Sequence, residues 1–375
     1  MKSRGSLLAL SVLLFVTFSL LPGAAQARTG PWDPRHTWVF MVGLVEWQDE
    51  ASFDGFPADN RKDTARLDTF KKRGIPTSQI VYLQDRQATT DVVQAKFNDF
   101  LQRPAPGDWV LVYFEGHGFR TDNDEKILAT YDATEQGLGW NFRSIPDAIE
   151  KNFRGDHAVI MLDNCYSGAM ADAVTATQRR VSYAVLASSM AAQESTGNWT
   201  YTEAMINGFS GEPFADLNHD GRVTLRELAK NAETDMLFGE QQVATTAVTG
   251  GFDPETVIAI TKAAVSPRIG ERVEAHSAGE WWRAYIVAEK GPRVLVHYYG
   301  YEQSQDRWIL TKNIRVPLYD SPFHPGEKVE VAYKHDWYPA HILNIRGQSH
   351  YVTYDDYDTD ENEWVPTTRI RKLSE

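Results

Sequence analysis

Continuous apolar runs that stop abruptly are the main feature of the first two thirds of the chain. Residues 158–162 are apolar without alternation and end at Asp163, and residues 109–114 end in the same way at Glu115. Such a run is typical of a central parallel strand that is covered on both faces. Further short runs alternate with helical patterns, which predicts an α/β domain with a mainly parallel sheet between helices. The further strands are expected at 37–47, 80–83 and 181–186, and the helices at 61–72, 90–102 and 145–152.

Two side chains with catalytic chemistry follow these two strand ends. His117 lies between glycines just beyond the first strand, and Cys165, the only cysteine of the chain, lies just beyond the second. The carboxyl edge of a parallel sheet is where active sites form. A cysteine nucleophile needs a base that takes its proton and later returns it to the leaving group. The pattern therefore predicts a His117–Cys165 dyad in which the backbone amides of Gly118 and Cys165 stabilise an oxyanion.

Around these residues the sequence resembles the caspase-like cysteine peptidases, the clan that includes legumains, metacaspases and caspases. The resemblance rests on EGHG at 115–118 and DNCYSG at 163–168, and it extends to RGIPTSQIVYLQD at 73–85, ILATYDA at 127–133 and ASSMAAQEST at 187–196. It implies a caspase-like α/β/α sandwich over about residues 36–262, peptide or protein substrates, and no cofactor for catalysis. The last segment resembles the strand that lines the substrate cleft, which implies a substrate-binding role for Ser195. The caspase residues around the cysteine are absent, so cleavage after aspartate is not implied.

Three acidic residues are candidates for the primary specificity pocket. Side chains alternate along a strand, so Glu115 and Asp163 are expected on the same face as the catalytic residues two positions later. In the resembled metacaspases and legumains the position of Asp163 is acidic and lines this pocket, and Asp63 in RKDTARL matches a second acidic pocket position of metacaspases. Crowded carboxylates favour a cation, which predicts cleavage after arginine or lysine. The alternatives are a legumain-like preference for asparagine, or carboxylates that lie on the surface or cap helices.

The N-terminal residues 1–27 have the three parts of a secretory signal peptide. Lys2 and Arg4 precede an apolar stretch at 7–21, and Ala25-Gln26-Ala27 matches a cleavage site between small residues. The protein is therefore expected to be secreted or periplasmic, with cleavage near Ala27 and no membrane attachment afterwards. An N-terminal membrane anchor is the alternative.

Composition and charge narrow the possible partners. The chain is 42% hydrophobic and 24% charged, as in ordinary globular proteins. Its net charge of −13 argues against nucleic acid or an anionic membrane as the main partner. A single cysteine cannot form a disulfide within the chain, so stability must come from core packing.

The segment at 216–227, DLNHDGRVTLRE, matches a calcium-binding loop. Oxygen ligands recur at the required spacing, and glycine stands at the sixth position. A Ca²⁺ ion there is expected to have a structural or activating role. The alternative is an aspartate-rich turn that caps the following helix. The expected ligands are Asp216, Asn218, Asp220, the carbonyl of Arg222, Thr224 and Glu227.

An internal repeat begins near residue 268 and appears when the chain is shifted by 56 positions. Trp281 then falls on Trp337, and Trp308 on Trp364, without gaps. Short alternating strands in each copy predict two small SH3-like β-barrels. GEKVEVAYKHDWYPAHIL at 326–343 and YVTYDDYD at 351–358 resemble the Tudor and Agenet family. The predicted organisation is a signal peptide at 1–27, a peptidase domain at 28–265, and Tudor-like domains at 266–318 and 319–375.

In the resembled Tudor family, an aromatic cage binds methylated or otherwise cationic side chains. The family's pattern carries onto Tyr333, Tyr338, Tyr354 and Tyr357 in the second copy. The first copy offers only Trp282, Tyr298 and Tyr301, because Ser277 stands where the fourth aromatic residue is expected. The alternative for each ring is a place in the barrel core.

Two functional hypotheses follow from these features. The first is an exported cysteine endopeptidase whose Tudor-like pair binds a partner or restrains the protease. The alternative is a binding protein that acts through the barrels, with a catalytically inactive caspase-like scaffold. The presence of both His117 and Cys165 favours the first.

Overall fold

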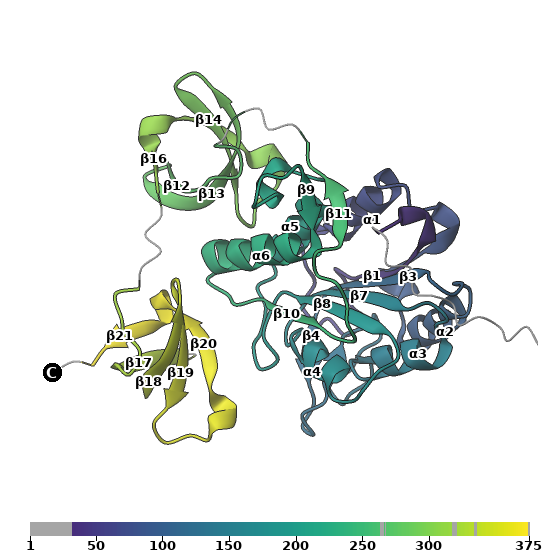
Figure 1. Ribbon diagram of the computed structural model, residues 1–375. Coiled ribbons are helices and arrows are strands. Elements are labelled where there is room, and N and C mark those ends of the chain that lie inside the picture. Colours follow the sequence, from purple (N-terminus) through teal and green to yellow (C-terminus); the bar gives the residue numbers. More distant parts are fainter. Residues whose placement is uncertain (1–31, 263–265, 267, 317–320, 334–335, 374–375) are drawn as a thin grey trace, which may run out of the picture.

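The computed structural model describes residues 32–262, 266, 268–316, 321–333 and 336–373 (Figure 1). The predicted signal peptide at 1–27 lies outside the described residues. Within the described ranges, no helix is both long and apolar enough to cross a membrane.

A six-stranded sheet with the order β10-β8-β7-β3-β1-β2 forms the centre of the first domain. Every residue of β3 is buried, as the apolar run at 109–114 predicts. The neighbouring pairs from β8 to β2 are parallel, and only β10 is antiparallel. The strands are β1 (Thr37–Gly43), β2 (Ile80–Gln84), β3 (Trp109–Glu115), β7 (His157–Asp163), β8 (Ser182–Ala187) and β10 (Thr245–Val248).

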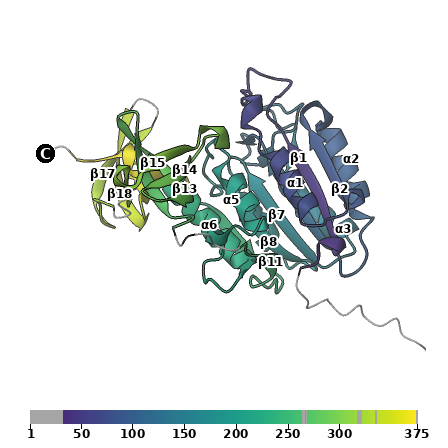
Figure 2. The same cartoon turned by 90° about the horizontal axis from the view of Figure 1, so that it is seen from above.

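Helices cover both faces of this sheet (Figures 1 and 2). Alternate residues of β3 enter two separate cores: Val112 packs in the core with α2, α3 and α4, and Leu111 in the core with α1, α5 and α6. The predicted α/β/α sandwich is therefore confirmed. The helices are α1 (Asp63–Lys72), α2 (Thr90–Leu101), α3 (Ser144–Asn152), α4 (Ala169–Thr175), α5 (Thr200–Phe209) and α6 (Leu225–Asp235).

Two smaller sheets complete the first domain. The strands β4 (Gly118–Arg120), β5 (Lys126–Leu128) and β6 (Trp140–Asn141) form an antiparallel sheet directly after the histidine strand. The strands β9 (Arg222–Thr224) and β11 (Val257–Ile260) pair beside the predicted calcium loop. The first of these sheets fixes the backbone that follows His117.

The C-terminal repeat forms two five-stranded antiparallel sheets, which confirms the two small barrels. Their strand orders correspond, β15-β14-β13-β12-β16 and β20-β19-β18-β17-β21, and each has its own apolar core. Both carry a bulge in the second strand, at Ile286 and at Ile342, which the repeat places on each other. The strands are β12 (Arg272–Ser277), β13 (Glu280–Lys290), β14 (Arg293–Tyr298), β15 (Arg307–Leu310), β16 (Ile314–Arg315), β17 (Lys328–Tyr333), β18 (Asp336–Arg346), β19 (Ser349–Tyr354), β20 (Glu363–Pro366) and β21 (Ile370–Lys372). Residues 263–265 and 317–320 lie outside the described residues, so the domain boundaries there stay predictions.

Buried charges join the first barrel to α5 and α6. Asp235 at the end of α6 accepts from the Arg272 guanidinium at 2.8 Å and from the Tyr299 hydroxyl at 2.6 Å. His297, 1% exposed, lies between Glu203 of α5 at 3.0 Å and Asp306 at 2.7 Å. Burial acts to lower the pKa of His297, but these two carboxylates outweigh it and raise the pKa.

The His297 ion pairs predict a loss of stability at alkaline pH. Because the pKa of His297 is raised in the folded protein, its contribution is complete below the usual value of about 6.5 and is lost as the pH rises through the folded value. Thermal unfolding of the wild type and of His297→Gln between pH 6 and pH 9 is the measurement. The melting temperature of the wild type is expected to fall more steeply, and parallel pH curves would contradict this assignment.

Candidate active site

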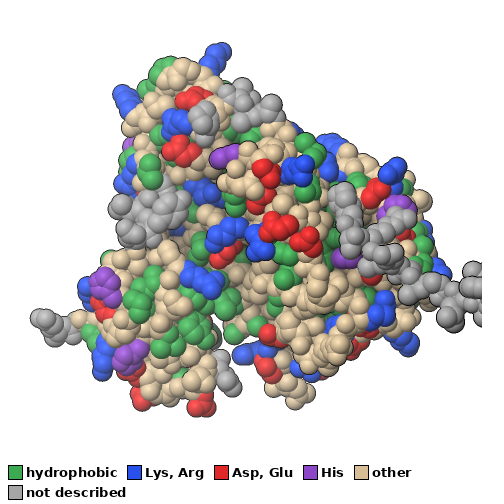
Figure 3. All heavy atoms as spheres, viewed as in Figure 1, with side chains coloured by type: hydrophobic (Ala, Val, Ile, Leu, Met, Phe, Trp, Pro, Cys, Tyr) green, Lys and Arg blue, Asp and Glu red, His purple; other side chains and the backbone are tan. Residues whose placement is uncertain are grey.

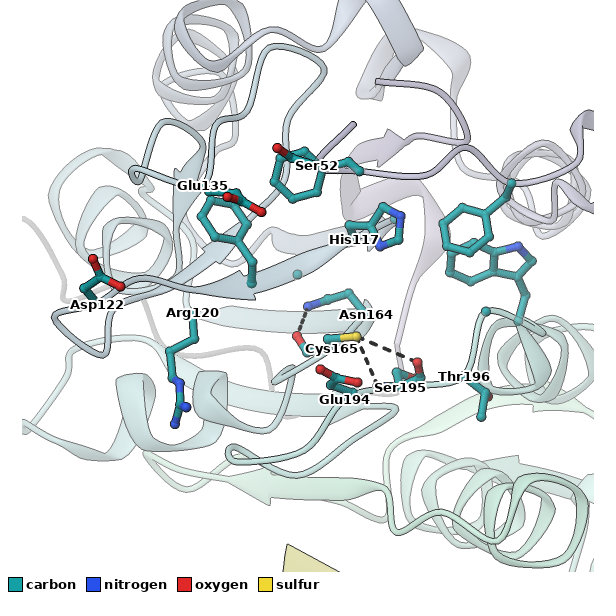
Figure 4. A pocket seen from close by; sticks show the side chains of 17 residues that line it. Ser52, His117, Arg120, Asp122, Glu135, Asn164, Cys165, Glu194, Ser195 and Thr196 are labelled. Carbon is teal, nitrogen blue, oxygen red and sulfur yellow. Dashed lines mark hydrogen bonds between the residues drawn. The ribbon is translucent and has the colours of Figure 1, made fainter. Parts of the chain in front are cut away.

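The two predicted catalytic residues share one cavity at the carboxyl edge of the sheet. Glu115 at the end of β3 pairs with Asp163 at the end of β7, so His117 and Cys165 each follow a neighbouring strand end. Both line a cavity of about 540 Å³, and Figure 4 shows the imidazole and the thiol on opposite sides of it. The structure thus brings the predicted dyad together.

Contacts with a loop and with aromatic rings orient His117. Its Nε2 lies 2.8 Å from the backbone oxygen of Asp54. A carbonyl oxygen only accepts, so Nε2 carries the proton and Nδ1 is left with a free lone pair. The rings of Trp47 and Phe56 pack 4.5 and 4.8 Å from the imidazole, and this burial lowers the pKa of His117. A neutral imidazole with a free Nδ1 is the form that a general base requires.

The thiol of Cys165 contacts the backbone of Ser195. The Ser195 N–H donates to Sγ at 3.2 Å, and the Ser195 carbonyl oxygen lies 3.7 Å from Sγ. Burial raises the pKa of Cys165 to about 11, and hydrogen bonding from the N–H groups of Ser195, Cys165 and Gly118 acts in the opposite direction. Two of these residues, Gly118 and Cys165, are the predicted oxyanion donors. The raised pKa favours the protonated thiol, so a nucleophilic role requires a base that takes its proton.

Gly118 is packed too tightly for any side chain. A Cβ at this position would lie 2.3 Å from the Cys165 oxygen and 2.4 Å from the Asn164 amide nitrogen. Asn164 in turn donates from that nitrogen to the Cys165 oxygen at 2.6 Å. Tyr166 follows with φ = 61°, which turns the chain sharply after the nucleophile. Together these features fix the direction of the thiol.

The structure corrects the predicted acidic pocket, because its three carboxylates do not line the active-site cavity. Asp63, Glu115 and Asp163 are at most 2% exposed, and none of them lines the cavity. Asp163 accepts from the backbone and hydroxyl of Thr202, both at 2.9 Å. The two strand-end acids do share one side of the sheet edge, but buried side chains and backbone amides satisfy them there, which alternation alone could not reveal.

These three carboxyls nevertheless act on one another. Burial, and then the neighbouring Asp63, raise the pKa of Glu115 to about 8, and burial raises that of Asp163 to about 6. Burial also raises the pKa of Asp63, although the Arg61 guanidinium at 2.6 Å opposes this. The backbone N–H of Lys62 donates to Glu115 at 3.2 Å. Buried neighbours therefore satisfy the acid cluster, and its side chains do not line the cavity.

Several residues of the site have little or no signal in the sequence. Asp54 acts through its backbone oxygen, so its side chain gives no signal. The sequence indicates a role for Asn164 only through its place next to Cys165 in the DNCYSG segment. In addition to Ser195, four charged residues line the cavity. They are Arg120, Asp122, Glu135 and Glu194.

In the predicted calcium loop, backbone N–H groups donate to the carboxylates that are the expected ligands. Asp216 accepts from the N–H groups of Asp220 and Gly221 at 3.1 and 2.9 Å. Glu227 accepts from Leu217 N–H at 3.1 Å and forms a capping box with Thr224 at the start of α6. In the part of the chain that the structure describes, no three His, Cys, Asp or Glu side chains are grouped to hold a metal. Asn218 and Arg222 belong to the same loop, and calcium binding stays a prediction.

Three aromatic rings are arranged alike in the two barrels, and the second barrel adds a fourth ring, that of Tyr333. In the first barrel Trp282 lies 5.9 Å from Tyr301, and Tyr298 is only 8% exposed. None of these three rings lines the active-site cavity. In the second barrel the four predicted tyrosines form a cluster of nearly perpendicular rings, with Tyr338 in contact with the other three.

Alkylation of Cys165 by a small reagent is expected to be slow. The pKa of about 11 leaves little thiolate at neutral pH, so reaction with iodoacetamide should be about tenfold or more slower than that of free cysteine. Its rate should rise steadily from pH 6 to pH 10. A plateau between pH 5 and pH 8 would contradict this, because it would indicate a resting thiolate–imidazolium pair.

The caspase domain family matches residues 59–247, about half of the chain and including both His117 and Cys165. The chain belongs to the caspase domain family. The Agenet domain family matches residues 326–375, the second barrel.

The similarity of this caspase-domain protein to individual known proteins is low. No curated protein matches the chain. A crystal structure of protein GSU0716 from Geobacter sulfurreducens is similar over 60% of this chain and 99% of that one, with 13% identity and a TM-score of 0.43. Membership of the family makes a cysteine peptidase the expected class.

Proposed function

We propose that this protein is an exported cysteine endopeptidase that uses a His117–Cys165 dyad and cleaves after basic residues. The observation that carries the proposal is that an oriented imidazole, a thiol and the residues Gly118 and Cys165, whose amides are the expected oxyanion donors, line one cavity. This is the set of groups that acyl transfer from a peptide requires.

The reaction follows from these groups. Nδ1 of His117 takes the thiol proton as Sγ attacks the carbonyl carbon of the scissile bond. The amides of Gly118 and Cys165 hold the oxyanion that forms, and His117 then gives its proton to the leaving amine. Water, deprotonated by His117, releases the acyl group and restores the thiol.

The buried acid cluster supports a preference for arginine or lysine. Burial raises the pKa values of Asp63, Glu115 and Asp163, and a substrate cation would stabilise their ionised forms. Such binding requires a movement that exposes these buried carboxyl groups to the substrate. A preference for asparagine is the alternative within the same reaction.

Peptidyl ketones that differ only in their terminal residue test this function. The arginyl reagent is expected to label Cys165 faster than the asparaginyl reagent, with mass spectrometry as the readout. Cys165→Ala is an internal control, because the chain has no other thiol. Faster labelling by the asparaginyl reagent would refute the basic preference. Labelling no faster than that of free cysteine would favour the alternative, an inactive scaffold whose barrels bind a partner.

A further inference from the structure

A second cavity lies between the four tyrosines of the second barrel and residues that also line the active-site cavity. It has a volume of about 730 Å³, and its walls come from the second barrel and from the caspase domain. The two cavities share four lining residues: Arg120, Glu194, Ser195 and Thr196. In Figure 4, Glu194, Ser195 and Thr196 lie along the thiol side of the active-site cavity. One strip of chain therefore borders both the nucleophile and the tyrosines.

The tyrosines have the geometry of a cage for a cation. Neighbouring rings lie 6.0 to 6.4 Å apart at interplanar angles of 67° to 87°. Tyr357 is 54% exposed, so solvent reaches the cage at this ring. Exposed aromatic faces that meet at right angles attract an ammonium or guanidinium group. We call Tyr333, Tyr338, Tyr354 and Tyr357 the tyrosine cage.

The charges around the tyrosine cage favour the same kind of ligand. Glu363 is compensated by Arg369, which contacts it at 2.8 and 3.1 Å. The remaining charged residues of this cavity are the carboxylates Glu194, Glu240 and Glu361 and the guanidinium of Arg120. The described lining of this second cavity is therefore net negative.

Hydrogen bonds between the domains hold the cage beside the nucleophile. The side chain of Gln193 donates to the backbone oxygen of Trp364 in β20. Gln242 donates to the Glu194 oxygen at 3.0 Å and accepts from the Thr196 N–H at 3.1 Å. The same strip of chain is thus tied to the second barrel and, through Ser195, to the sulfur of Cys165.

Because the two cavities share these lining residues, we infer that the tyrosine cage is a subsite for the peptide being cleaved. A cationic side chain of the substrate, distant in sequence from the residue at the scissile bond, binds in the cage while the intervening backbone lies along residues 194–196. The inference rests on the proposed function, because it assigns the ligand of the cage and the substrate of the protease to one chain. It concerns the second barrel alone.

Peptides that contain one scissile arginine and a second variable residue provide the first test. The variable residue is lysine, trimethyl-lysine or the neutral norleucine, placed in turn at successive positions on both sides of the arginine. At the position that reaches the cage, lysine and trimethyl-lysine are each expected to raise kcat/KM roughly tenfold over norleucine. Tyr357→Ala should remove this gain. Equal rates at every position would overturn the inference, as would a gain for lysine alone, which would indicate an ion pair instead of a cage.

A matched variant in the same barrel is the control. Trp337 in β18 is 37% exposed, packs over Arg371 at 4.1 Å and lines neither the active-site cavity nor the cavity of the cage. Its side chain alternates with that of Tyr338, so it points away from the cage. Trp337→Ala should keep the full gain from lysine, and its loss there as well would overturn the assignment to the cage.

Binding to Cys165→Ala separates this inference from the proposed function. Fluorescence anisotropy with the lysine and norleucine peptides measures the cage without any turnover. If the wild type cleaves no peptide but the lysine peptide still binds roughly tenfold more tightly, the protease proposal fails and the cage site stands. If the wild type cleaves both peptides equally and both bind equally, the cage inference fails and the protease stands.

Discussion

Replacement of Cys165 by alanine is expected to lower kcat/KM for peptide hydrolysis by a factor of at least about 10⁴. In the proposed mechanism the sulfur forms the covalent intermediate, and His117, the proposed base, lines the same cavity. His117→Ala should cost nearly as much, and the double variant little more, because the two residues act as a unit. Rates on the best arginyl peptide from the specificity test are the measurement.

Stability distinguishes this result from simple unfolding. Cys165 is only partly buried, so loss of its thiol should change the free energy of unfolding by no more than about 1 kcal/mol. Thermal unfolding of each variant therefore serves as the control. Residual hydrolysis above a tenth of the wild-type rate in either single variant would contradict the dyad.

Gly118→Ala is expected to reduce activity roughly a hundredfold although both His117 and Cys165 remain in the chain. The new methyl group would lie 2.3 Å from the Cys165 oxygen, so the loop that carries the thiol must move. The φ angle of Gly118 is not positive, and alanine is compatible with the backbone there. The expected loss is thus a displacement of the nucleophile and of one oxyanion donor, measured as a fall in kcat.

Gly279→Ala is the matched glycine variant. Gly279 has φ = +90° and open space around it, in the turn between β12 and β13. Alanine there should cost about 1 kcal/mol of stability through backbone strain and leave kcat unchanged. Equal activity of the two variants would show that Gly118 does not position the thiol.

The sequence predicts the strand ends well for a physical reason. A parallel strand covered on both faces must be apolar throughout, so the polar residues after 162 and after 114 mark the sheet edge directly. Parallel neighbours end at the same edge, and this brings His117 and Cys165 together. The 56-residue repeat can also be recognised in the sequence, because equivalent aromatic and glycine positions recur without gaps.

The tertiary contacts of individual side chains are much harder to predict from the sequence. Alternation places Glu115 and Asp163 on one side of their strands, but it cannot show that Thr202 and Lys62 come from distant segments to satisfy them. The orientation of His117 depends on the backbone oxygen of Asp54, which every residue type offers. A hydrogen bond from the backbone has no sequence pattern of its own.

The π-helical turn η6 (Met236–Glu240) has a mechanical consequence for this protein. Phe238 in this turn accepts from Arg283 of the first barrel at 2.6 Å, and the Gln241 oxygen just after it accepts from Ser349 of the second at 2.8 Å. The next residue, Gln242, holds the strip that donates to the sulfur. Residues 238–242 therefore link both barrels to the segment that donates to the sulfur. A protein truncated near residue 265 would lose the hydrogen bonds from Arg283 and Ser349, so its turnover would not measure that of the full chain.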